Sequence, residues 1–312
     1  MQTDSLKVFL APTSFALDSI APLELLESKG YRINSNELSK KLTKDEIISM
    51  ASDCDAVVAG TEIYDRDVLK KFHKLRVISR LGVGLDNVDI EYAEKRNIKV
   101  YKTESNPALA VSELTLGIIL NLLRQVNLHD RLLRKGVWQK TIGSLFSGKT
   151  LGVIGLGNIG KELIKLTIGF DLNYLAHDIN QDKDFMDRYS VRYCDLDELL
   201  VESDIVSVHL NLTNDTKNMI NYKRLRKMKP KAILINTSRS EVINEQDLIK
   251  ALDNHLIAGI GVDVFQQEPY TGPLLKYDNA ICTPHIGSYA REIRVKMEME
   301  AASNLIKGLD SE

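Results

Sequence analysis

Residues 151–160 read LGVIGLGNIG, and this stretch decides the fold. Its first four residues are apolar enough for a buried strand, and its last six match G-x-G-x-x-G. Gly155 permits a tight turn, Gly157 lets a pyrophosphate approach the backbone, and Gly160 allows the following helix to pack closely on the strand. We expect that helix over residues 159–167, with its first N–H groups facing the pyrophosphate.

An acidic residue follows at a distance typical of dinucleotide sites. A second apolar stretch ends at Asp178, 23 residues after Gly155. A carboxylate there accepts hydrogen bonds from ribose hydroxyls and repels a 2′-phosphate. Neither Ile179 nor Asn180 supplies an arginine to receive such a phosphate. The pattern therefore favours NAD(H) over NADP(H), the alternative being a glycine turn without a ligand.

Strand and helix patterns alternate on both sides of this motif, which indicates an α/β protein with parallel sheets. The downstream part contains six expected strands, over residues 151–154, 172–177, 204–209, 232–236, 257–262 and 280–283, as a doubly wound nucleotide-binding sheet requires. The upstream part contains three, over residues 8–11, 56–59 and 76–79, with helices over 22–30 and 67–74. It forms a smaller unit that closes near residue 104.

The segment 107–135 predicts one long helix. Asn106 suits the N-cap and Pro107 the first turn, and the next breakers are Gly117 and Gly136. Its leucines and isoleucines surround the helix too widely for a single buried stripe. It must be covered on more than one face, either between the two domains or by a second copy of the chain. A final helix is expected over residues 290–309.

Composition excludes several classes of protein. The 312 residues include 44% hydrophobic and 27% charged residues, and the formal net charge is −2, so nothing drives binding to nucleic acid or membranes. The basic run 223–231 reads as a helix with a solvated face. Three scattered cysteines form neither a disulfide framework nor a zinc site, which favours a cytoplasmic setting without a metal. The first seven residues do not resemble a signal peptide.

Of the six histidines, His285 is the candidate for acid–base chemistry. It follows the last strand in TPHIGS. Arg239 follows a second strand, Asp263 ends a third, and Glu268 comes shortly after it. An arginine can hold a carboxylate, and a histidine can exchange a proton with an alcohol or carbonyl oxygen. A nearby carboxylate can orient the imidazole. Spacing alone leaves open whether these side chains meet.

These residues complete a resemblance to the D-isomer-specific 2-hydroxyacid dehydrogenase family that covers nearly the whole chain. Further matching stretches are residues 79–89, 236–239, 261–269 and 283–287. The most similar members are D-3-phosphoglycerate dehydrogenases without a regulatory domain. The resemblance implies two Rossmann-like domains. A doubly wound NAD-binding domain, residues 105–286 with a dimer-arm helix over 107–135, is inserted in a smaller flavodoxin-like substrate-binding domain, residues 1–104 and 287–312.

The resemblance also assigns roles to individual residues. Arg239, Glu268 and His285 would be catalytic, with His285 the general acid/base, Glu268 its partner and Arg239 the substrate-binding cation. The substrate would further contact the backbone of Gly82, Val83 and Gly84, and Arg80 is a candidate cation. The cofactor site would comprise Gly155, Gly157, Asn158, Ile159, Gly160, Asp178, Leu210, Thr237, Ser238, Asp263 and Ser288. The family further implies a homodimer.

Three departures affect these expectations. Ser240 replaces the glycine that usually follows the catalytic arginine, which matters if that position needs a positive φ. Asn211 replaces a frequent proline. A phosphate-binding arginine of the phosphoglycerate-specific relatives aligns with Ala59, which weakens the case for a phosphorylated substrate.

The sequence therefore predicts an NAD(H)-dependent oxidoreductase that acts on a 2-hydroxy or 2-oxo acid, with D-3-phosphoglycerate dehydrogenase as the leading hypothesis. A glyoxylate or hydroxypyruvate reductase is the alternative within this class. Formate oxidation is disfavoured, because family members with that activity carry Gln at the position of Glu268. A non-catalytic protein that senses NAD(H) is the alternative from another class.

Overall fold

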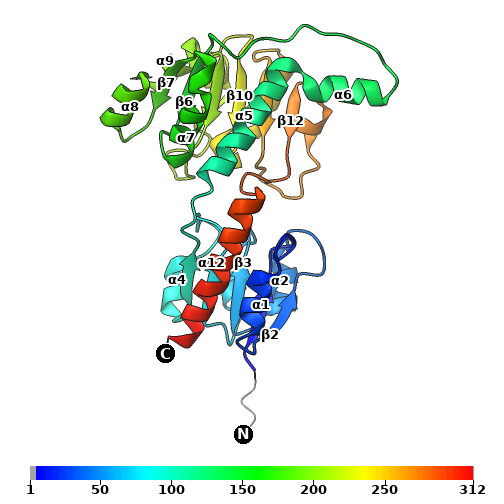
Figure 1. The fold of residues 1–312 in the computed structure, drawn as a ribbon, viewed down its shortest axis with the longest axis vertical. Coiled ribbons are helices and arrows are strands. Elements are labelled where there is room, and N and C mark those ends of the chain that lie inside the picture. Colours follow the sequence, from blue (N-terminus) through cyan, green and yellow to red (C-terminus); the bar gives the residue numbers. More distant parts are fainter. Residues whose placement is uncertain (1–4, 312) are drawn as a thin grey trace. The chain divides into compact units, whose positions relative to one another are not determined.

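The computed structural model describes residues 5–311, which form two α/β units (Figure 1). The first unit runs to Asn106 and resumes at Tyr289, and the second comprises Pro107–Ser288. Both boundaries lie two residues beyond the predicted ones. Residues 1–4, part of the stretch judged unlike a signal peptide, lie outside the described residues.

The first unit contains a five-stranded parallel sheet in the order β2-β1-β3-β4-β5, which is the flavodoxin-like order. Its strands are β1 (Lys7–Leu10), β2 (Arg32–Ser35), β3 (Ala56–Ala59), β4 (Val77–Arg80) and β5 (Lys99–Lys102). The sequence predicted the three central strands, which are buried apolar runs. It missed β2 and β5, because these edge strands are short and rich in polar residues.

Five helices cover this sheet: α1 (Ala21–Glu27), α2 (Lys44–Ala51), α3 (Arg66–Leu69), α4 (Ile90–Lys95) and α12 (Arg291–Asp310). The helix predicted over 67–74 is only the single turn α3. Helix α12, red in Figure 1, packs along β3, β4, β5 and α1. The hydroxyl of Ser79 donates to the carbonyl of Ala301 at 2.7 Å, which ties α12 to β4. The C-terminal segment thus completes the core of the first unit.

The second unit contains a seven-stranded parallel sheet in the order β12-β11-β10-β9-β6-β7-β8. The strands are β6 (Thr150–Ile154), β7 (Asn173–His177), β8 (Val191–Tyr193), β9 (Ile205–Val208), β10 (Ile233–Asn236), β11 (Gly259–Val262) and β12 (Ala280–Cys282). The order reverses between β6 and β9, where doubly wound sheets bind nucleotides. The three-residue edge strand β8 was not predicted, because so short a run carries almost no periodicity.

Helices lie on both faces of this sheet: α5 (Ala108–Arg124), α6 (Val126–Arg134), α7 (Asn158–Thr167), α8 (Lys183–Tyr189), α9 (Leu196–Glu202), α10 (Tyr222–Leu225) and α11 (Glu245–Asp253). Three 3-10 turns complete the unit: η1 (Ile168–Phe170), η2 (Ser240–Val242) and η3 (Pro273–Lys276). The basic run 223–231 forms less helix than predicted. Its Leu225 and Met228 are buried, and Lys227 pairs with Asp197 at 2.6 Å.

The prediction of one helix over residues 107–135 was wrong. The chain breaks at Gln125, which has φ 53° and ψ 36°, and α5 and α6 meet at 66°. Gly117, the only glycine within the predicted helix, remains helical. Helix α5 buries one face against the sheet and α7, whereas α6 has no buried residue. Within residues 5–311, no single helix could span a membrane, although α5 and α6 together meet that test by length and composition.

Candidate functional site

The carboxyl edge of the second unit's sheet carries most of the predicted site residues, in the order of its strands. Parallel strands all end at the same edge, so residues distant in sequence become neighbours there. Across the sheet these are His285 after β12, Glu268 after β11, Arg239 after β10, Leu210 after β9, Gly155 after β6 and Asp178 after β7. The edge thus places the candidate acid–base groups on one side of the switch point and the glycine turn with Asp178 on the other.

His285 and Glu268 are in direct contact. The Nδ1 of His285 lies 2.9 Å from Oε1 of Glu268, and the same oxygen accepts the backbone N–H of Phe265 at 3.3 Å. An ionised carboxylate can only accept, so Nδ1 of His285 carries the proton of this hydrogen bond. The imidazole is 37% exposed and the carboxylate 14%. Glu268 therefore fixes the ring while leaving Nε2 as the nitrogen available for a substrate.

Asp263 holds the loop that carries His285. Its Oδ1 accepts the hydroxyl of Thr283 at 2.7 Å and the N–H of Ile286 at 2.8 Å, and its Oδ2 accepts the N–H of Gly287 at 2.8 Å. The side chain is 1% exposed, and this burial raises the pKa of Asp263 although the hydrogen bonds oppose the change. The carboxylate of Asp263 thus holds the loop that carries His285. The contact with the cofactor that the sequence assigns to Asp263 stays a prediction.

The loop of Arg239 is held by Asn236, the last residue of β10. The amide of Asn236 donates to the carbonyl of Arg239 at 2.9 Å and accepts the N–H and hydroxyl of Ser238 at 3.1 and 2.9 Å. The half-buried guanidinium of Arg239 donates to the carbonyl of Ser238 at 2.9 Å. Ser240, in place of the usual glycine, begins the turn η2 without a positive φ, so its Cβ does not strain the loop.

The glycine turn fits a pyrophosphate. Gly155 has φ 96°, and a Cβ there would lie 2.4 Å from the carbonyl of His209, so only glycine suits this position. A Cβ at Gly160 would lie 2.3 Å from the carbonyl of Gly155. At Gly157 a Cβ would meet open space, and no side chain caps α7. The uncapped N-terminus at Asn158 and Ile159 therefore provides amide donors and room for a negatively charged group.

Asp178 is fixed against this turn. Its Oδ2 accepts the N–H of Leu156 at 2.6 Å, and its Oδ1 accepts the N–H of Asn180 at 2.7 Å. Each oxygen keeps a further lone pair for a hydroxyl donor. Leu210 packs against the core at the switch point. The assignment of Ser288 to the cofactor stays a prediction. The N–H donors of the turn suit the pyrophosphate of an adenosine diphosphate group, and the carboxylate of Asp178 suits its ribose hydroxyls.

The first unit contains the remaining predicted residues, and two of them, Arg80 and Gly82, make contacts within it. Arg80 donates to the carbonyl of Leu81. Its guanidinium packs against Gly82, where an added Cβ would lie 1.9 Å from Nη1 of Arg80. The N–H of Gly82 donates to the hydroxyl of Thr103 at 3.0 Å. Arg80 and Gly82 therefore make contacts inside the first unit. The contact of Val83 and Gly84 with a substrate carboxylate stays a prediction.

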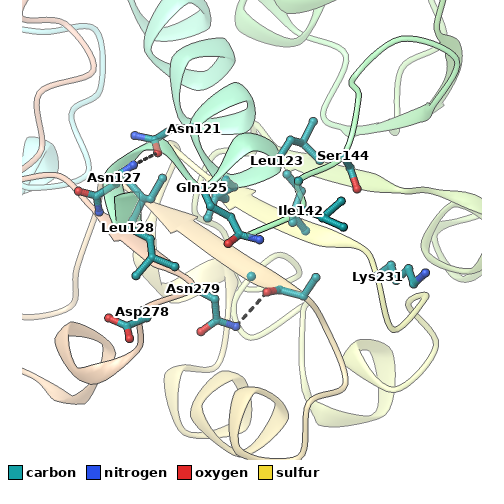
Figure 2. A pocket seen from close by; sticks show the side chains of 16 residues that line it. Asn121, Leu123, Gln125, Asn127, Leu128, Ile142, Ser144, Lys231, Asp278 and Asn279 are labelled. Atoms are coloured by element: carbon teal, nitrogen blue, oxygen red, sulfur yellow. Dashed lines mark hydrogen bonds between the residues drawn. The ribbon is translucent and has the colours of Figure 1, made fainter. Parts of the chain in front are cut away.

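A pocket of about 230 Å³ lies at the opposite, amino-terminal edge of the second unit's sheet (Figure 2). It is lined by the junction of α5 and α6, with Gln125 and Asn121, and by Lys231 and Asn279 near the starts of β10 and β12. None of the predicted site residues lines it. Within residues 5–311, no cluster of three or more His, Cys, Asp or Glu side chains could hold a metal ion.

Sequence reasoning missed four residues that support the site: Asn236, Thr283, Ser112 and Thr115. The first two stand inside motifs that had been quoted, but spacing does not show which backbone groups they bind. Ser112 and Thr115 lie on α5, more than 40 residues before the groups they contact. No local pattern could have revealed them.

Comparison with known proteins agrees with this geometry. Residues 116–287 match the family model described as D-isomer specific 2-hydroxyacid dehydrogenase, NAD binding domain. A glyoxylate reductase from Thermofilum pendens is 40% identical over 86% of this chain and 83% of its own length. A hydroxypyruvate reductase from Thermotoga maritima is 35% identical over 91% of this chain and 95% of its own.

Relatives with other names are also similar. A D-3-phosphoglycerate dehydrogenase from Methanocaldococcus jannaschii is 35% identical over 88% of this chain but only 54% of its own length. The solved structure of the TT0316 protein from Thermus thermophilus superposes with a TM-score of 0.86 at 31% identity, covering 98% of this chain and 97% of that one.

Proposed function

We propose that this chain, which belongs to the D-isomer specific 2-hydroxyacid dehydrogenase family and is an NAD-dependent oxidoreductase, reduces small unphosphorylated 2-oxo acids of the glyoxylate and hydroxypyruvate class. The observation that carries the proposal is the 2.9 Å contact between His285 and Glu268, beside Arg239 on one sheet edge. It supports proton transfer to a carbonyl oxygen next to a cation that binds carboxylates.

The residues divide the chemistry between them. NADH, held by the glycine turn and Asp178, supplies a hydride to the carbonyl carbon when bound. Protonated His285 would donate the proton of Nε2 to the oxygen on which negative charge develops. Glu268 would stabilise the imidazolium before this transfer by accepting from Nδ1. Arg239 stabilises the same oxygen and the substrate carboxylate. The resemblance also assigns the amides of Val83 and Gly84 to that carboxylate, and this stays a prediction.

Two features of the first unit favour an unphosphorylated substrate. Ala59, where phosphoglycerate-specific relatives would place an arginine, is fully buried and cannot bind a phosphate. Arg80, which pairs with Ala59 across β3 and β4, turns its guanidinium beneath Gly82 instead. The names of the relatives in Thermofilum and Thermotoga support the same choice. We therefore place the reductase ahead of D-3-phosphoglycerate dehydrogenase, the leading hypothesis from the sequence.

The test is NADH oxidation with glyoxylate by the wild type and by His285→Asn. The wild type should turn over glyoxylate, and the variant should lose roughly 10²- to 10⁴-fold in kcat. The Kd of NADH, measured from the fluorescence change on binding, should stay the same in the variant. Near-normal turnover by the variant would exclude His285 as the acid. Wild-type binding of NADH without turnover of any 2-oxo acid would favour a non-catalytic NAD(H) sensor.

We also propose that the chain forms a homodimer through α6 and the segment after it. Helix α6 has no buried residue, although Val126 and Leu133 are apolar. The following segment exposes 82% of Trp138, 98% of Ile142 and 73% of Leu145. Exposed apolar side chains gathered on one segment are typical of a surface that another protein covers. A second copy of this chain could cover this surface without any other protein, so we propose it as the partner.

Light scattering after size-exclusion chromatography tests the dimer. The wild type should have twice the mass of the chain, and Ile142→Glu combined with Leu145→Glu should shift it toward the monomer. Ile168→Glu, at an exposed isoleucine outside this segment, is the matched control and should not change the mass. A monomeric wild type, or a double variant that stays dimeric, would contradict the proposal.

A further inference from the structure

One turn of helix α5 contacts loops that carry predicted site residues. The hydroxyl of Ser112 donates to the carbonyl of Ile159, in the first turn of α7, at 3.0 Å. The side chain of Val111 packs on Gly287, where a Cβ would lie 3.3 Å from Cγ2 of Val111. Ser112 is fully buried in the second unit. Helix α5 therefore supports both the glycine turn and the loop of His285.

A third contact of the same turn reaches the loop of Arg239. The hydroxyl oxygens of Thr115 and Thr237 lie 3.0 Å apart, and both side chains are buried. Thr115 Oγ1 also lies 2.7 Å from the carbonyl of Val111, which can only accept. A hydroxyl has a single proton, so Thr115 donates to Val111 and Thr237 must donate to Thr115. The direction of the bond between the two threonines follows.

This bond restrains the loop at a residue that Asn236 does not hold. The amide of Asn236 clamps Ser238 and the carbonyl of Arg239, while the hydroxyl of Thr237, two residues before Arg239, is held by α5. The backbone from which the guanidinium extends is thus restrained on two sides. Without the oxygen of Thr115, the buried proton of Thr237 would have no acceptor, and the loop or its side chain would have to turn.

We propose that Thr115 is a positioning residue that sets the orientation of Arg239 through the hydroxyl of Thr237. This inference rests on the proposed function, because Arg239 is taken as the group that binds the 2-oxo acid. Thr115 contacts the loop of Arg239, whereas the glycine turn is contacted by Ser112. The sequence assigns Thr237 to the cofactor, but its hydroxyl is directed to Thr115, so we take this hydroxyl as a support of the loop. Substituting Thr115 should therefore weaken the binding of the 2-oxo acid more than that of NADH.

The first experiment compares Thr115→Val, which keeps the shape and removes the hydroxyl, with Thr115→Ser, which restores it. With Thr115→Val, kcat/KM for glyoxylate should fall roughly tenfold, the effect of one buried hydrogen bond. The Kd of oxamate, an unreactive 2-oxo acid analogue, should rise by a similar factor in the presence of NADH. The Kd of NADH alone should stay within about twofold, and Thr115→Ser should recover most of the loss.

Thr167→Val is the matched control. Thr167 is equally buried in the same unit, and its hydroxyl donates to the carbonyl of Leu163 four residues earlier, as that of Thr115 does to Val111. Its other contacts are the carbonyl of Ile164 and the hydroxyl of Tyr174 rather than a site loop. It should therefore lose stability to a similar extent and keep the wild-type Kd of oxamate. Equal losses of oxamate affinity in both variants would show a general loss of packing and overturn the proposal.

A second comparison tests the route through Arg239. In an Arg239→Lys background, Thr115→Val should cause little further loss of kcat/KM, because the group that it positions is no longer the guanidinium. A full additional tenfold loss would overturn the proposal. Should Thr115→Val fail to fold, Thr237→Val removes the same bond and should also weaken oxamate binding, and unchanged binding would contradict it. A wild type inactive toward every 2-oxo acid would instead refute the proposed function.

Discussion

The carboxylate of Asp263 accepts the backbone N–H of Gly287 at 2.8 Å, two residues beyond His285. With the bonds from Thr283 and Ile286, this contact ties the loop of the general acid to the end of β11. Glu268 holds the imidazole ring of the same histidine. Two carboxylates thus divide the work, one holding the backbone of His285 and the other its side chain.

Replacing Asp263 should disturb both stability and catalysis. In Asp263→Asn, one amide nitrogen would face a donor, either the N–H of Gly287 or the groups of Thr283 and Ile286. We expect the free energy of unfolding to fall by about 1–3 kcal/mol and kcat to fall with it. Denaturant unfolding and steady-state kinetics measure the two effects. Thr283→Val, which removes one donor, should cost less, and an Asp263→Asn variant of wild-type stability would refute this role.

Replacing Glu268 by Gln should change the pH dependence of reduction. Glutamine can still accept the proton of Nδ1 but does not stabilise a positive charge on His285. The pH above which glyoxylate reduction slows should therefore move to a lower value, and kcat should fall less than in His285→Asn. A profile of kcat/KM against pH checks this. An unshifted profile would mean that the charge of Glu268 is not used.

Asp178 should determine the choice between NADH and NADPH. Asp178→Asn keeps an acceptor for the N–H of Leu156 but removes the charge that repels a 2′-phosphate. The ratio of kcat/KM for NADH to that for NADPH should fall by roughly tenfold or more. Asp182→Asn, at an acid paired with Lys161 at the start of α8, is a control that should keep the ratio. An unchanged ratio in Asp178→Asn would remove the residue from the cofactor site.

His209 should make stability depend on pH. Burial lowers its pKa from 6.5 to about 4, and its Nδ1 has no hydrogen-bond partner among the described residues. The unfolded chain binds the proton near pH 6.5 and the folded protein only near pH 4, so stability falls as the pH drops through this window. The loss should reach at most about 3 kcal/mol at low pH.

The matched variant for this prediction is His209→Gln, which does not titrate and can keep a contact with the hydroxyl of Ser207, now 2.8 Å from Nε2. Its free energy of unfolding should vary less between pH 6.5 and 4 than that of the wild type. Parallel curves for the two proteins would contradict the assignment to His209.

Particular residues show how far the sequence could predict this protein. The strands β6, β9 and β10 are buried apolar runs, and the turn after β6 must be glycine, so the doubly wound sheet was predictable. The break at Gln125 was not, because glutamine carries no turn preference and the left-handed conformation is imposed by the structure around it. Three strands were missed. β2 and β5 are edge strands whose polar residues resemble loops, and β8 has only three residues.

The sequence could locate the site, but it could not show which side chains and backbone groups bind one another there. Residues at strand ends converge because parallel strands share an edge, which placed His285, Glu268 and Arg239 correctly on the sheet. The partner of a side chain depends on its direction, so the sequence did not show that Asp263 holds the loop of His285. The contact between Thr115 and Thr237 spans 122 residues and leaves no local trace.

The measurement that tests the central claim most directly is the ratio of kcat/KM for hydroxypyruvate to that for 3-phosphohydroxypyruvate, with NADH at saturation. The two acids differ only in the phosphate. Because Ala59 supplies no cation and Arg80 is turned into the first unit, we predict that the unphosphorylated acid is preferred. A clear preference for the phosphorylated acid would contradict the account and return D-3-phosphoglycerate dehydrogenase to first place.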